Sequence, residues 1–296
     1  MLSKNKVNQL CSLHQKKGRN LQNLFIAEGQ KLVQDLLVSD LRVMEVYFVE
    51  DGKLELGSKL GLDSKFELDR LSYFVEIAAE DMKKISALTT PTNCLAVVEI
   101  PDFVLDNQAL LGKLSLVVED VRDPGNLGTI IRIADWFGID ELICSAETVD
   151  CYNPKVVQAT MGSIARVKVH YLDLVEFIKE MKGDKELKGD KELKALKEMN
   201  GEEEIKGGRT KGLGNTSFEI YGTLMDGERI DGVKLSDKGL IVIGNEGRGI
   251  SDALQGLLTK KISIPRFGHV EPKRGQAESL NAAVATALVC AEFRRG

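Results

Sequence analysis

The stretch that most constrains the fold lies near the C-terminus, where a short apolar run stops at a glycine-rich loop. Residues 240–243 are Leu-Ile-Val-Ile, and glycines follow at positions 244, 247 and 249. Four apolar residues that end at a glycine are typical of a buried strand, and closely spaced glycines let the backbone fold tightly around something small. In open α/β sheets, ligands bind beyond the carboxyl ends of the strands. We therefore expect a ligand-binding loop that begins at Gly244.

Further segments are expected to meet this loop. Residues 262–265, Ile-Ser-Ile-Pro, predict a second strand, and Ser251-Asp252 predicts the cap of a short helix through Leu258. Residues 279–281, Ser-Leu-Asn, predict the start of a last helix that runs to Arg294. Two strand ends and one helix start would then converge on one space.

The composition argues against several classes of protein. The chain has 296 residues, 43% of them hydrophobic, with no segment like a signal peptide and no apolar membrane span. We therefore expect a cytoplasmic protein without a membrane partner. The five cysteines show no C-x-x-C spacing and the three histidines lie far apart, so neither a disulfide framework nor a metal site is predicted.

Charge is unevenly distributed along the chain. The net charge of −5 argues weakly against nucleic acid as a partner, but binding depends on how charges are arranged on one face. No acidic residue precedes Glu28, whereas five basic residues do: Lys4, Lys6, Lys16, Lys17 and Arg19. We predict that this segment contacts nucleic-acid phosphates, with Lys16, Lys17 and Arg19 as the candidate residues.

Alternating strands and helices predict two α/β units. In the first, residues 2–17 predict an amphipathic helix, and the following segments predict strand 25–29, helix 30–38, strand 43–49, helix 80–88 and strand 94–100. Residues 101–112 read as a linker, which gives a small N-terminal domain over residues 1–108 and a second domain over residues 112–296.

The second domain repeats the same alternation. We expect strand 114–119, loop 120–128, helix 129–137, strand 141–144, a helix that starts at Asn153-Pro154, and a strand at 166–170. Ile130, Ile133, Ala134 and Phe137 would share the buried stripe of helix 129–137. Arg132 would then lie on another face, in the first turn and near the loop.

Residues 182–211 interrupt this alternation. They contain 9 Lys/Arg and 8 Asp/Glu, no aromatic residue, and the sequence Gly-Asp-Lys-Glu-Leu-Lys twice, at 183–188 and 189–194. Such a composition cannot bury a core. It predicts a flexible, solvated insertion over residues 182–215, and an RNA-contacting arm is the alternative.

Five polar side chains are expected around the space where the strands end. They are two amides, a guanidinium, a carboxylate and a hydroxyl: Asn126, Asn281, Arg132, Glu246 and Ser279. No nucleophilic Cys or Ser with a His partner is among them, and neither G-x-G-x-x-G nor a Walker loop is present, which disfavours hydride and phosphoryl transfer. Each residue could instead be a turn anchor or a helix cap, and Ser279 is a good N-cap.

These motifs together resemble the SpoU (TrmH-like) family of RNA 2′-O-ribose methyltransferases, in the SPOUT superfamily. The first motif is residues 123–134, Asp-Pro-Gly-Asn-Leu-Gly-Thr-Ile-Ile-Arg-Ile-Ala, and the second is residues 243–251, Ile-Gly-Asn-Glu-Gly-Arg-Gly-Ile-Ser. The third is Ile264-Pro265 followed by residues 279–285, Ser-Leu-Asn-Ala-Ala-Val-Ala. Residues 13–31 also resemble that family's RNA substrate-binding domain.

The resemblance implies a C-terminal α/β knot, with a parallel sheet, flanking helices and a trefoil knot, beside a small N-terminal α/β substrate-binding domain. It also implies S-adenosylmethionine as methyl donor, a ribose 2′-hydroxyl of RNA as acceptor, and a homodimer. The residues expected to hold the cofactor are Ile243, Gly244, Asn245, Gly247, Ile264, Leu280 and Asn281.

The family assigns the removal of the hydroxyl proton to the arginine that Arg132 matches. A guanidinium has a pKa above about 12 and is a poor base. Orienting the hydroxyl and stabilising its developing charge is therefore an equally good description. Asn126 would position Arg132 or the ribose, Glu246 would hold neighbouring donors, and Ser279 and Asn281 would complete the polar wall.

The substrate remains open between related classes. The N-terminal domain favours ribosomal RNA of the 23S type over transfer RNA, for which a 2′-O-methyltransferase is the alternative. A non-catalytic RNA-binding assembly factor and a small-molecule methyltransferase are further alternatives. Residues 266–278 form a longer loop than the family would predict, with Arg266, Lys273 and Arg274, either as an RNA-facing lip or as a surface extension.

Overall fold

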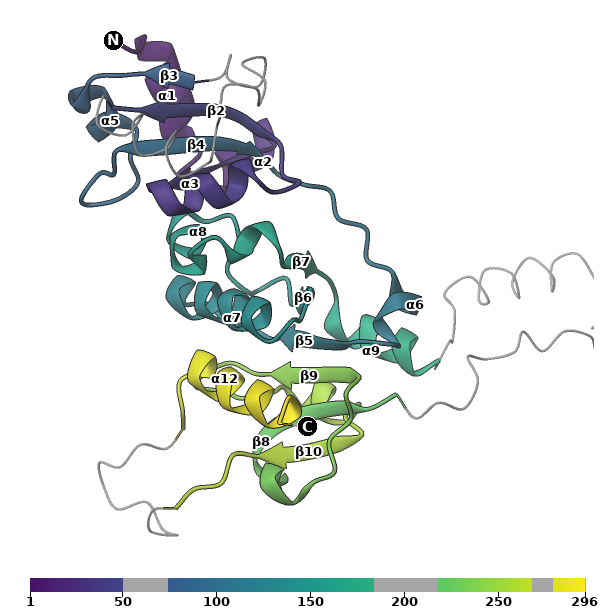
Figure 1. The fold of residues 1–296 in the computed structure, drawn as a ribbon. Helices are drawn as coiled ribbons and strands as arrows, with labels where there is room; N and C mark the ends of the chain where they lie inside the picture. Colours follow the sequence, from purple (N-terminus) through teal and green to yellow (C-terminus); the bar gives the residue numbers. More distant parts are fainter. Residues whose placement is uncertain (50–73, 184–217, 268–278, 296) are drawn as a thin grey trace, which may run out of the picture.

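The computed structural model describes residues 1–49, 74–183, 218–267 and 279–295, which form two sheets and the helices that cover them (Figure 1). The first sheet has the order β1-β4-β2-β3. Its strands are β1 Leu24–Glu28, β2 Val43–Phe48, β3 Phe74–Glu76 and β4 Cys94–Glu99. β4 pairs antiparallel with β1 and β2, and β3 pairs parallel with β2.

Helices cover both faces of the first sheet. They are α1 Lys4–Ser12, α2 Lys16–Gln22, α3 Gln30–Leu37 and α5 Ala79–Ile85. Alternate strand residues face opposite sides: Ile26 and Tyr47 pack with Leu10 of α1 and Met82 of α5, while Phe25 faces the other way, toward α3.

The single helix predicted over residues 2–17 is wrong, because the chain turns between α1 and α2. Leu13 is fully buried there, and its carbonyl oxygen accepts a hydrogen bond from Arg19. α2 then crosses so close to the end of α1 that a Cβ at Gly18 would lie 2.0 Å from the carbonyl oxygen of Ser12. The crossing requires glycine.

The second sheet has six strands in the order β10-β8-β9-β5-β6-β7. Every pairing in it is parallel. The strands are β5 Leu114–Val118, β6 Glu141–Cys144, β7 Lys168–Tyr171, β8 Ile220–Arg229, β9 Gly239–Ile243 and β10 Lys260–Ser263. Their carboxyl ends therefore lie along one edge, where the sequence predicted a site.

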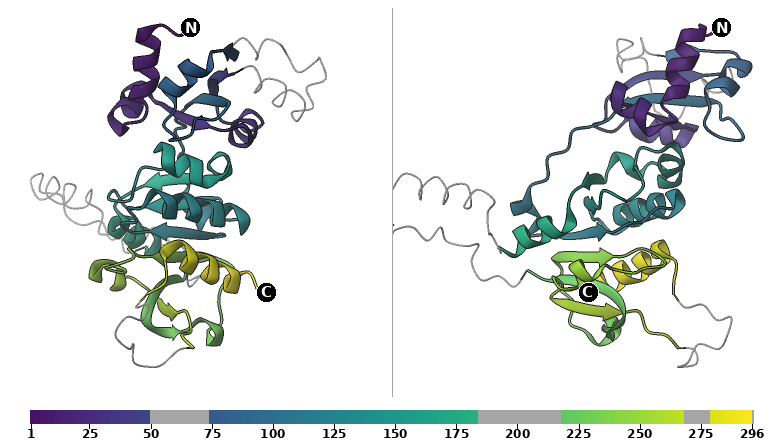
Figure 2. Two further views of the ribbon diagram at one scale, coloured as in Figure 1. Left: turned by 90° about the vertical axis from the view of Figure 1, so that its left-hand side faces the viewer. Right: turned by 180° about the vertical axis from the view of Figure 1, so that it is seen from behind.

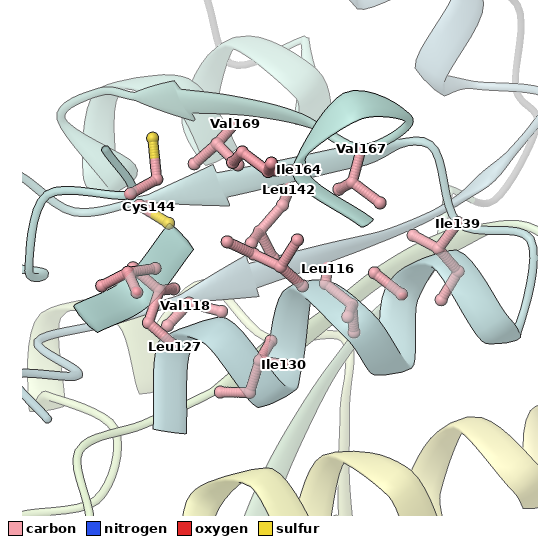
Figure 3. Close-up of a cluster of buried hydrophobic side chains, with 14 of the residues drawn as sticks. Leu116, Val118, Leu127, Ile130, Ile139, Leu142, Cys144, Ile164, Val167 and Val169 are labelled. Atoms are coloured by element: carbon pink, nitrogen blue, oxygen red, sulfur yellow. The ribbon is translucent and has the colours of Figure 1, made fainter. Parts of the chain in front are cut away.

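Both faces of the second sheet are covered (Figures 1 and 2). One carries α7 Pro124–Trp136, α8 Pro154–Thr160 and α12 Ala282–Phe293, and the other carries α6 Asn107–Leu110, α9 Leu174–Lys182 and α11 Asp252–Gln255. Leu116 and Val118 of β5 pack with Ile130 of α7 (Figure 3). Val117 points the other way and packs with Phe177 of α9.

The packing of α7 differs in detail from the predicted stripe. Leu127, Ile130, Ile131 and Ala134 are buried, whereas Ile133 and Phe137 are only partly buried. The helix also begins earlier than predicted, at Pro124 instead of Thr129, so Leu127 belongs to it.

The two units share one hydrophobic core. Phe25 of β1 lies in the same buried cluster as residues of α7 and α8, and its ring centroid is 4.8 Å from that of Tyr152. The side chain of Asp35 in α3 packs against Gly162, which has a positive φ of 98° and no room for a Cβ. The domains therefore form a packed interface.

The predicted linker contains a short helix. α6 begins at Asn107, within the predicted linker, and buries Leu110 against the second sheet. The predicted domain boundary between residues 108 and 112 stays a prediction. Most of the predicted insertion 182–215 and residues 268–278 of the predicted loop lie outside the described ranges.

None of the helices in the described ranges combines the length and apolarity needed to cross a bilayer. Nor, within these ranges, do three or more His, Cys, Asp or Glu side chains gather so that they could hold a metal ion.

Candidate active site at the carboxyl edge of the parallel sheet

The first site residue is fixed by the way α7 begins. Asp123 is the N-cap and its Oδ1 accepts the backbone N–H of Asn126 at 2.8 Å, while Pro124 supplies the fixed φ that suits a first helical position. Asn126 thus stands in the first turn of a helix, and the prediction that it lies in a loop is wrong. Asp followed by Pro is a recognised helix start, so the sequence did indicate that the helix begins at Pro124.

Three predicted site residues form a continuous hydrogen-bonded chain at this edge. Asn126 Nδ2 donates to Glu246 Oε1 at 2.6 Å, and Asn281 Nδ2 donates to Asn126 Oδ1 at 2.8 Å. Asn281 is also the N-cap of α12, where its Oδ1 accepts the N–H groups of Ala283 and Val284. We call Asn281, Asn126 and Glu246 the amide–carboxylate chain.

The two ends of this chain determine its polarity. An ionised carboxylate only accepts, so Asn126 must turn its NH₂ toward Glu246 and its oxygen toward Asn281. At the other end the backbone N–H groups of α12 only donate, so Asn281 must give them its oxygen and keep its NH₂ for Asn126. Both amide orientations follow from the partners and need no further assumption. The chain therefore joins all three sequence motifs in one defined orientation.

The glycine-rich loop after β9 holds Glu246 in place. Gly244 and Gly249 approach so closely that a Cβ at Gly244 would lie 2.3 Å from the carbonyl carbon of Gly249. Asn245 exchanges two backbone hydrogen bonds with Gly249, and its Oδ1 accepts the N–H groups of Gly247 and Arg248. The polar groups of Asn245 are thus engaged in shaping the loop, and its predicted role as a cofactor ligand stays a prediction.

Asp120 is a residue of this site that the sequence reasoning missed. Its φ is 52°, in the left-handed region, where Asp is more common than most residues. Its N–H donates to Ser145 Oγ at 3.0 Å and its carbonyl accepts Asn245 Nδ2 at 2.7 Å. Asp120 therefore ties together the loops that follow β5, β6 and β9.

Ser279 and Leu280 complete this side of the site. Ser279 is exposed, and its Oγ lies 3.5 Å from the carbonyl oxygen of Glu246, a long contact. Asn281, not Ser279, caps α12, so the alternative of Ser279 as N-cap is wrong. Leu280 is 47% exposed, and Ile264, directly after β10, is partly buried against the core.

Arg132 does not join the other site residues. Because α7 starts at Pro124, Arg132 lies six residues beyond Asn126, about 9 Å further along the helix axis, and not in the first turn as predicted. Its side chain is exposed, with no hydrogen bond or ion pair to any described residue.

The predicted RNA contacts divide into two kinds. Lys16 and Lys17 are exposed on α2, and no ion pair with a described residue engages them. Arg19 is 2% exposed and pairs with Asp150 of the second domain, so its predicted role as a direct RNA contact is wrong. Lys6, expected to be unopposed, pairs with Glu45 at 2.8 Å.

Thiol chemistry has no support at this site. Burial raises the pKa of the Cys144 and Cys290 thiols, and also that of Cys151. These cysteines stay protonated at neutral pH and cannot act as thiolate nucleophiles.

Two protein families match the chain. A model of the SpoU rRNA Methylase family matches residues 113–206 and 209–291. A model of the MRM3-like substrate binding domain matches residues 4–96. Together the matches cover the second sheet and the first sheet up to residue 96, within β4.

Individual relatives agree with the family match. The chain is 26% identical to 23S rRNA (guanosine(2553)-2′-O)-methyltransferase RlmP of Bacillus subtilis over 290 residues, 98% of this chain and 96% of the relative. A solved structure of a putative RNA methyltransferase of the TrmH family from Porphyromonas gingivalis is 31% identical, with a TM-score of 0.72, and the match covers 100% of this chain and 99% of that one. The AdoMet-bound rRNA methyltransferase of Sinorhizobium meliloti has the same fold at 23% identity, with a TM-score of 0.73 over 100% of this chain and 96% of its own.

Proposed function

Because this chain belongs to the SpoU rRNA methylase family, we propose that it transfers a methyl group from S-adenosylmethionine to a ribose 2′-hydroxyl of RNA. The observation that carries the proposal is the amide–carboxylate chain, which joins residues from three separate motifs at the carboxyl edge of the parallel sheet. Ligands of open α/β folds bind at this edge.

The residues at this edge fit the cofactor. Gly244 and Gly247 offer backbone without side chains, and the apolar side chains of Ile264 and Leu280 are partly accessible beside them. Such a mixture of backbone polar groups and apolar walls suits an adenosine. When bound, S-adenosylmethionine supplies an electrophilic methyl group. Ile243 and Asn281 would border the same pocket, and Asn245 would contribute by holding the loop.

The amide–carboxylate chain would orient the ribose. Glu246 accepts from Asn126 through Oε1, which leaves Oε2 as an acceptor for a donor such as a ribose hydroxyl. Ser279 stands next to the backbone of Glu246 with an exposed hydroxyl. These groups can hold the 2′-hydroxyl close to the methyl carbon, and that positioning contributes a large part of catalysis in transfers of this kind.

A second copy of the chain would complete the site. Leu280, Val284 and Leu288 are 47%, 49% and 45% exposed at a spacing of four residues, and Trp136 on the neighbouring α7 is 83% exposed. α7 and α12 run side by side in the same direction, since Asn126 meets Asn281 at their starts and Arg294 binds the carbonyl of Phe137 at their ends. An exposed apolar surface of this kind marks an interface.

Arg132 lies four residues before Trp136, so both side chains share one face of α7. A homodimer through this face would bring Arg132 into the interface, where it could reach a ribose bound to the partner. We propose that Arg132 acts there on the acceptor hydroxyl. Mixing Arg132→Ala with Glu246→Ala chains should restore part of the activity that each variant lacks alone. Full inactivity of the mixture, with dimers present in sedimentation, would refute the arrangement.

Ribosomal RNA of the 23S type is the proposed substrate, and the cytoplasm the proposed location. The support is the Bacillus subtilis relative, which matches along nearly its whole length, and the match of residues 4–96 to a substrate-binding domain. Transfer RNA is the alternative acceptor. A non-catalytic assembly factor is less consistent with the sequence, because all five predicted polar residues are present.

The deciding experiment is methyl transfer from labelled S-adenosylmethionine to unmodified transcripts of 23S rRNA and of bulk transfer RNA, followed by mapping of ribose methylation. We expect one 2′-O-methylated nucleotide in 23S rRNA and none with Asn126→Ala. Methylation of transfer RNA alone would show that the substrate is transfer RNA and not 23S rRNA. Cofactor binding without transfer to either RNA would favour the assembly factor.

A further inference from the structure

One buried ion pair connects the two domains. Arg19 of α2 directs both Nε and Nη2 at Asp150 Oδ2, at 3.0 and 2.5 Å, and its Nη1 donates to the carbonyl of Leu13 at 2.9 Å. The other carboxylate oxygen of Asp150 accepts the N–H of Tyr152 at 3.0 Å. Both partners are largely removed from solvent. The planar fork of the guanidinium is therefore used on three sides, and it holds α2 in one orientation.

The loop that carries Asp150 is bound to the active edge. It follows β6, and Val149 N–H donates to the carbonyl of Val121 at 3.0 Å. Ser145 Oγ in the same loop accepts the N–H of Asp120 at 3.0 Å. Asp120 and Val121 lead directly into Asp123, the cap of the helix that carries Asn126. The path from Arg19 to the amide–carboxylate chain therefore consists of hydrogen bonds that alternate with short stretches of backbone, from Asp150 to Val149 and from Val121 to Asp123.

Exposed lysines flank this pair on both domains. Lys16 and Lys17 stand within three residues of Arg19 on α2, and Lys155 stands five residues after Asp150, at the start of α8. All three are exposed, and none forms an ion pair with a residue in the described ranges. They supply unopposed positive charge next to the Arg19–Asp150 pair, and such charge suits RNA phosphates.

We propose that Arg19 is a positioning residue: through Asp150 it holds the RNA-contacting lysines of the first domain in a fixed register with the active edge of the second. The inference rests on the proposed RNA methyltransferase function and assigns Arg19 and Asp150 a role in selecting the ribose. Lys155 extends the same RNA surface onto the second domain.

The size of the effect follows from the geometry of transfer. The reacting atoms must be held near contact distance, and a misplacement of about 1 Å can cost on the order of a hundredfold in rate. A lysine at position 19 would keep the charge but could not reach Asp150 and Leu13 together. Loss of the fork should therefore impair transfer to RNA that spans both domains, while the cofactor pocket, formed by the second domain, is unaffected.

The test compares Arg19→Gln, Arg19→Lys and Asp150→Asn with the matched control Arg42→Gln, which removes an exposed arginine that pairs with Glu99 inside the first domain. The readouts are cofactor affinity, RNA affinity by filter binding, KM and kcat on a 23S rRNA transcript, and the mapped position of methylation. We expect unchanged cofactor affinity, weaker RNA binding, a tenfold or larger loss of kcat/KM for RNA, and methylation that spreads to neighbouring riboses. The control should behave like the wild-type chain.

A purely structural role would lower the folded fraction without moving the methylated position. If Arg19→Gln fails to fold, the proposal is tested with Arg19→Lys and Asp150→Asn, once melting curves have shown that these variants are folded. Wild-type RNA affinity, kcat/KM and methylated position in a folded Asp150→Asn variant would overturn the proposal. Filter binding requires no turnover, so it tests the Arg19 inference even if the wild-type chain transfers no methyl group, a result that would count only against the proposed function.

Discussion

Replacing Asn281 separates two roles that one side chain plays in this structure. Asn281 caps α12 through Oδ1 and orients Asn126 through Nδ2. Changing it to alanine removes both roles. The lost cap costs about 1 kcal/mol and the lost hydrogen bond about 1 kcal/mol more. At about 2 °C per kcal/mol for a chain of this size, the melting temperature should fall by about 4 °C.

Aspartate at this position should keep the cap, since Asp and Asn are equally good N-caps. It would, however, place a carboxylate against the Oδ1 of Asn126. Asn126 presents an oxygen on one side and an NH₂ on the other, so it cannot donate to this carboxylate and to Glu246 at once. Asn281→Asp should therefore melt within about 2 °C of the wild type yet lose methyl transfer as severely as Asn281→Ala.

Differential scanning fluorimetry and a methyl-transfer assay on 23S rRNA measure the two effects. Equal loss of stability in both variants would show that the cap estimate is wrong. Near-normal turnover in the aspartate variant would refute the argument that the polarity of the amide–carboxylate chain matters to the reaction.

Two further predictions concern stability. Gly128→Ala should destabilise the protein by about 1–3 kcal/mol in urea titrations, because the new Cβ would lie 2.5 Å from that of Ala159. At the control position Gly125, on the same helix, a Cβ would meet only the side-chain oxygen of Asp123, at 3.1 Å, so Gly125→Ala should cost clearly less; equal effects would refute the packing argument. For Glu141, burial is the largest single influence and raises the pKa, but the hydrogen bonds and charges of His170 and Lys168 together lower it by more, so the folded pKa lies below the usual 4.5. The stability that Glu141 contributes is present above pH 4.5 and is lost as the pH falls through the folded pKa. Melting curves at about pH 7 and about pH 3.5 should show less acid destabilisation for Glu141→Gln than for the wild type, and an equal loss would contradict the sign.

Much of the architecture could be predicted from periodicity. Strands β5, β6 and β9 are short apolar runs between loops, and their parallel pairing brings Asn126 and Glu246 to one edge from positions 120 residues apart. β8 was not predicted, because Ile220–Arg229 contains two glycines and several charged residues, which weaken the strand signal. Its place between β10 and β9 in the sheet depends on tertiary pairing.

The start of α7 shows how a correct local signal can be outweighed. Gly125 and Gly128 suggested a loop, although Asp123-Pro124 is a strong helix start. Gly128 is helical because α8 packs directly on it, where a Cβ would also approach the carbonyl oxygen of Val156. A glycine inside a helix can be explained only once its packing partner is known, and that partner lies about thirty residues further along the chain.

Charge counting failed at Arg19 for a related reason. The absence of acidic residues before Glu28 made Arg19 look unopposed, but its carboxylate partner is Asp150, 131 residues away. Lys16 and Lys17 on the same helix form no ion pair with a residue of the described ranges, so one basic segment contains two different kinds of cation. A guanidinium can fill a buried fork-shaped site that an ammonium cannot. This accounts for an arginine in the buried pair with Asp150 and for lysines at the exposed start of α2. The chemical type of each cation therefore carries information about its role that its sign alone does not, and the buried arginine acts on RNA only through the lysines it holds in place.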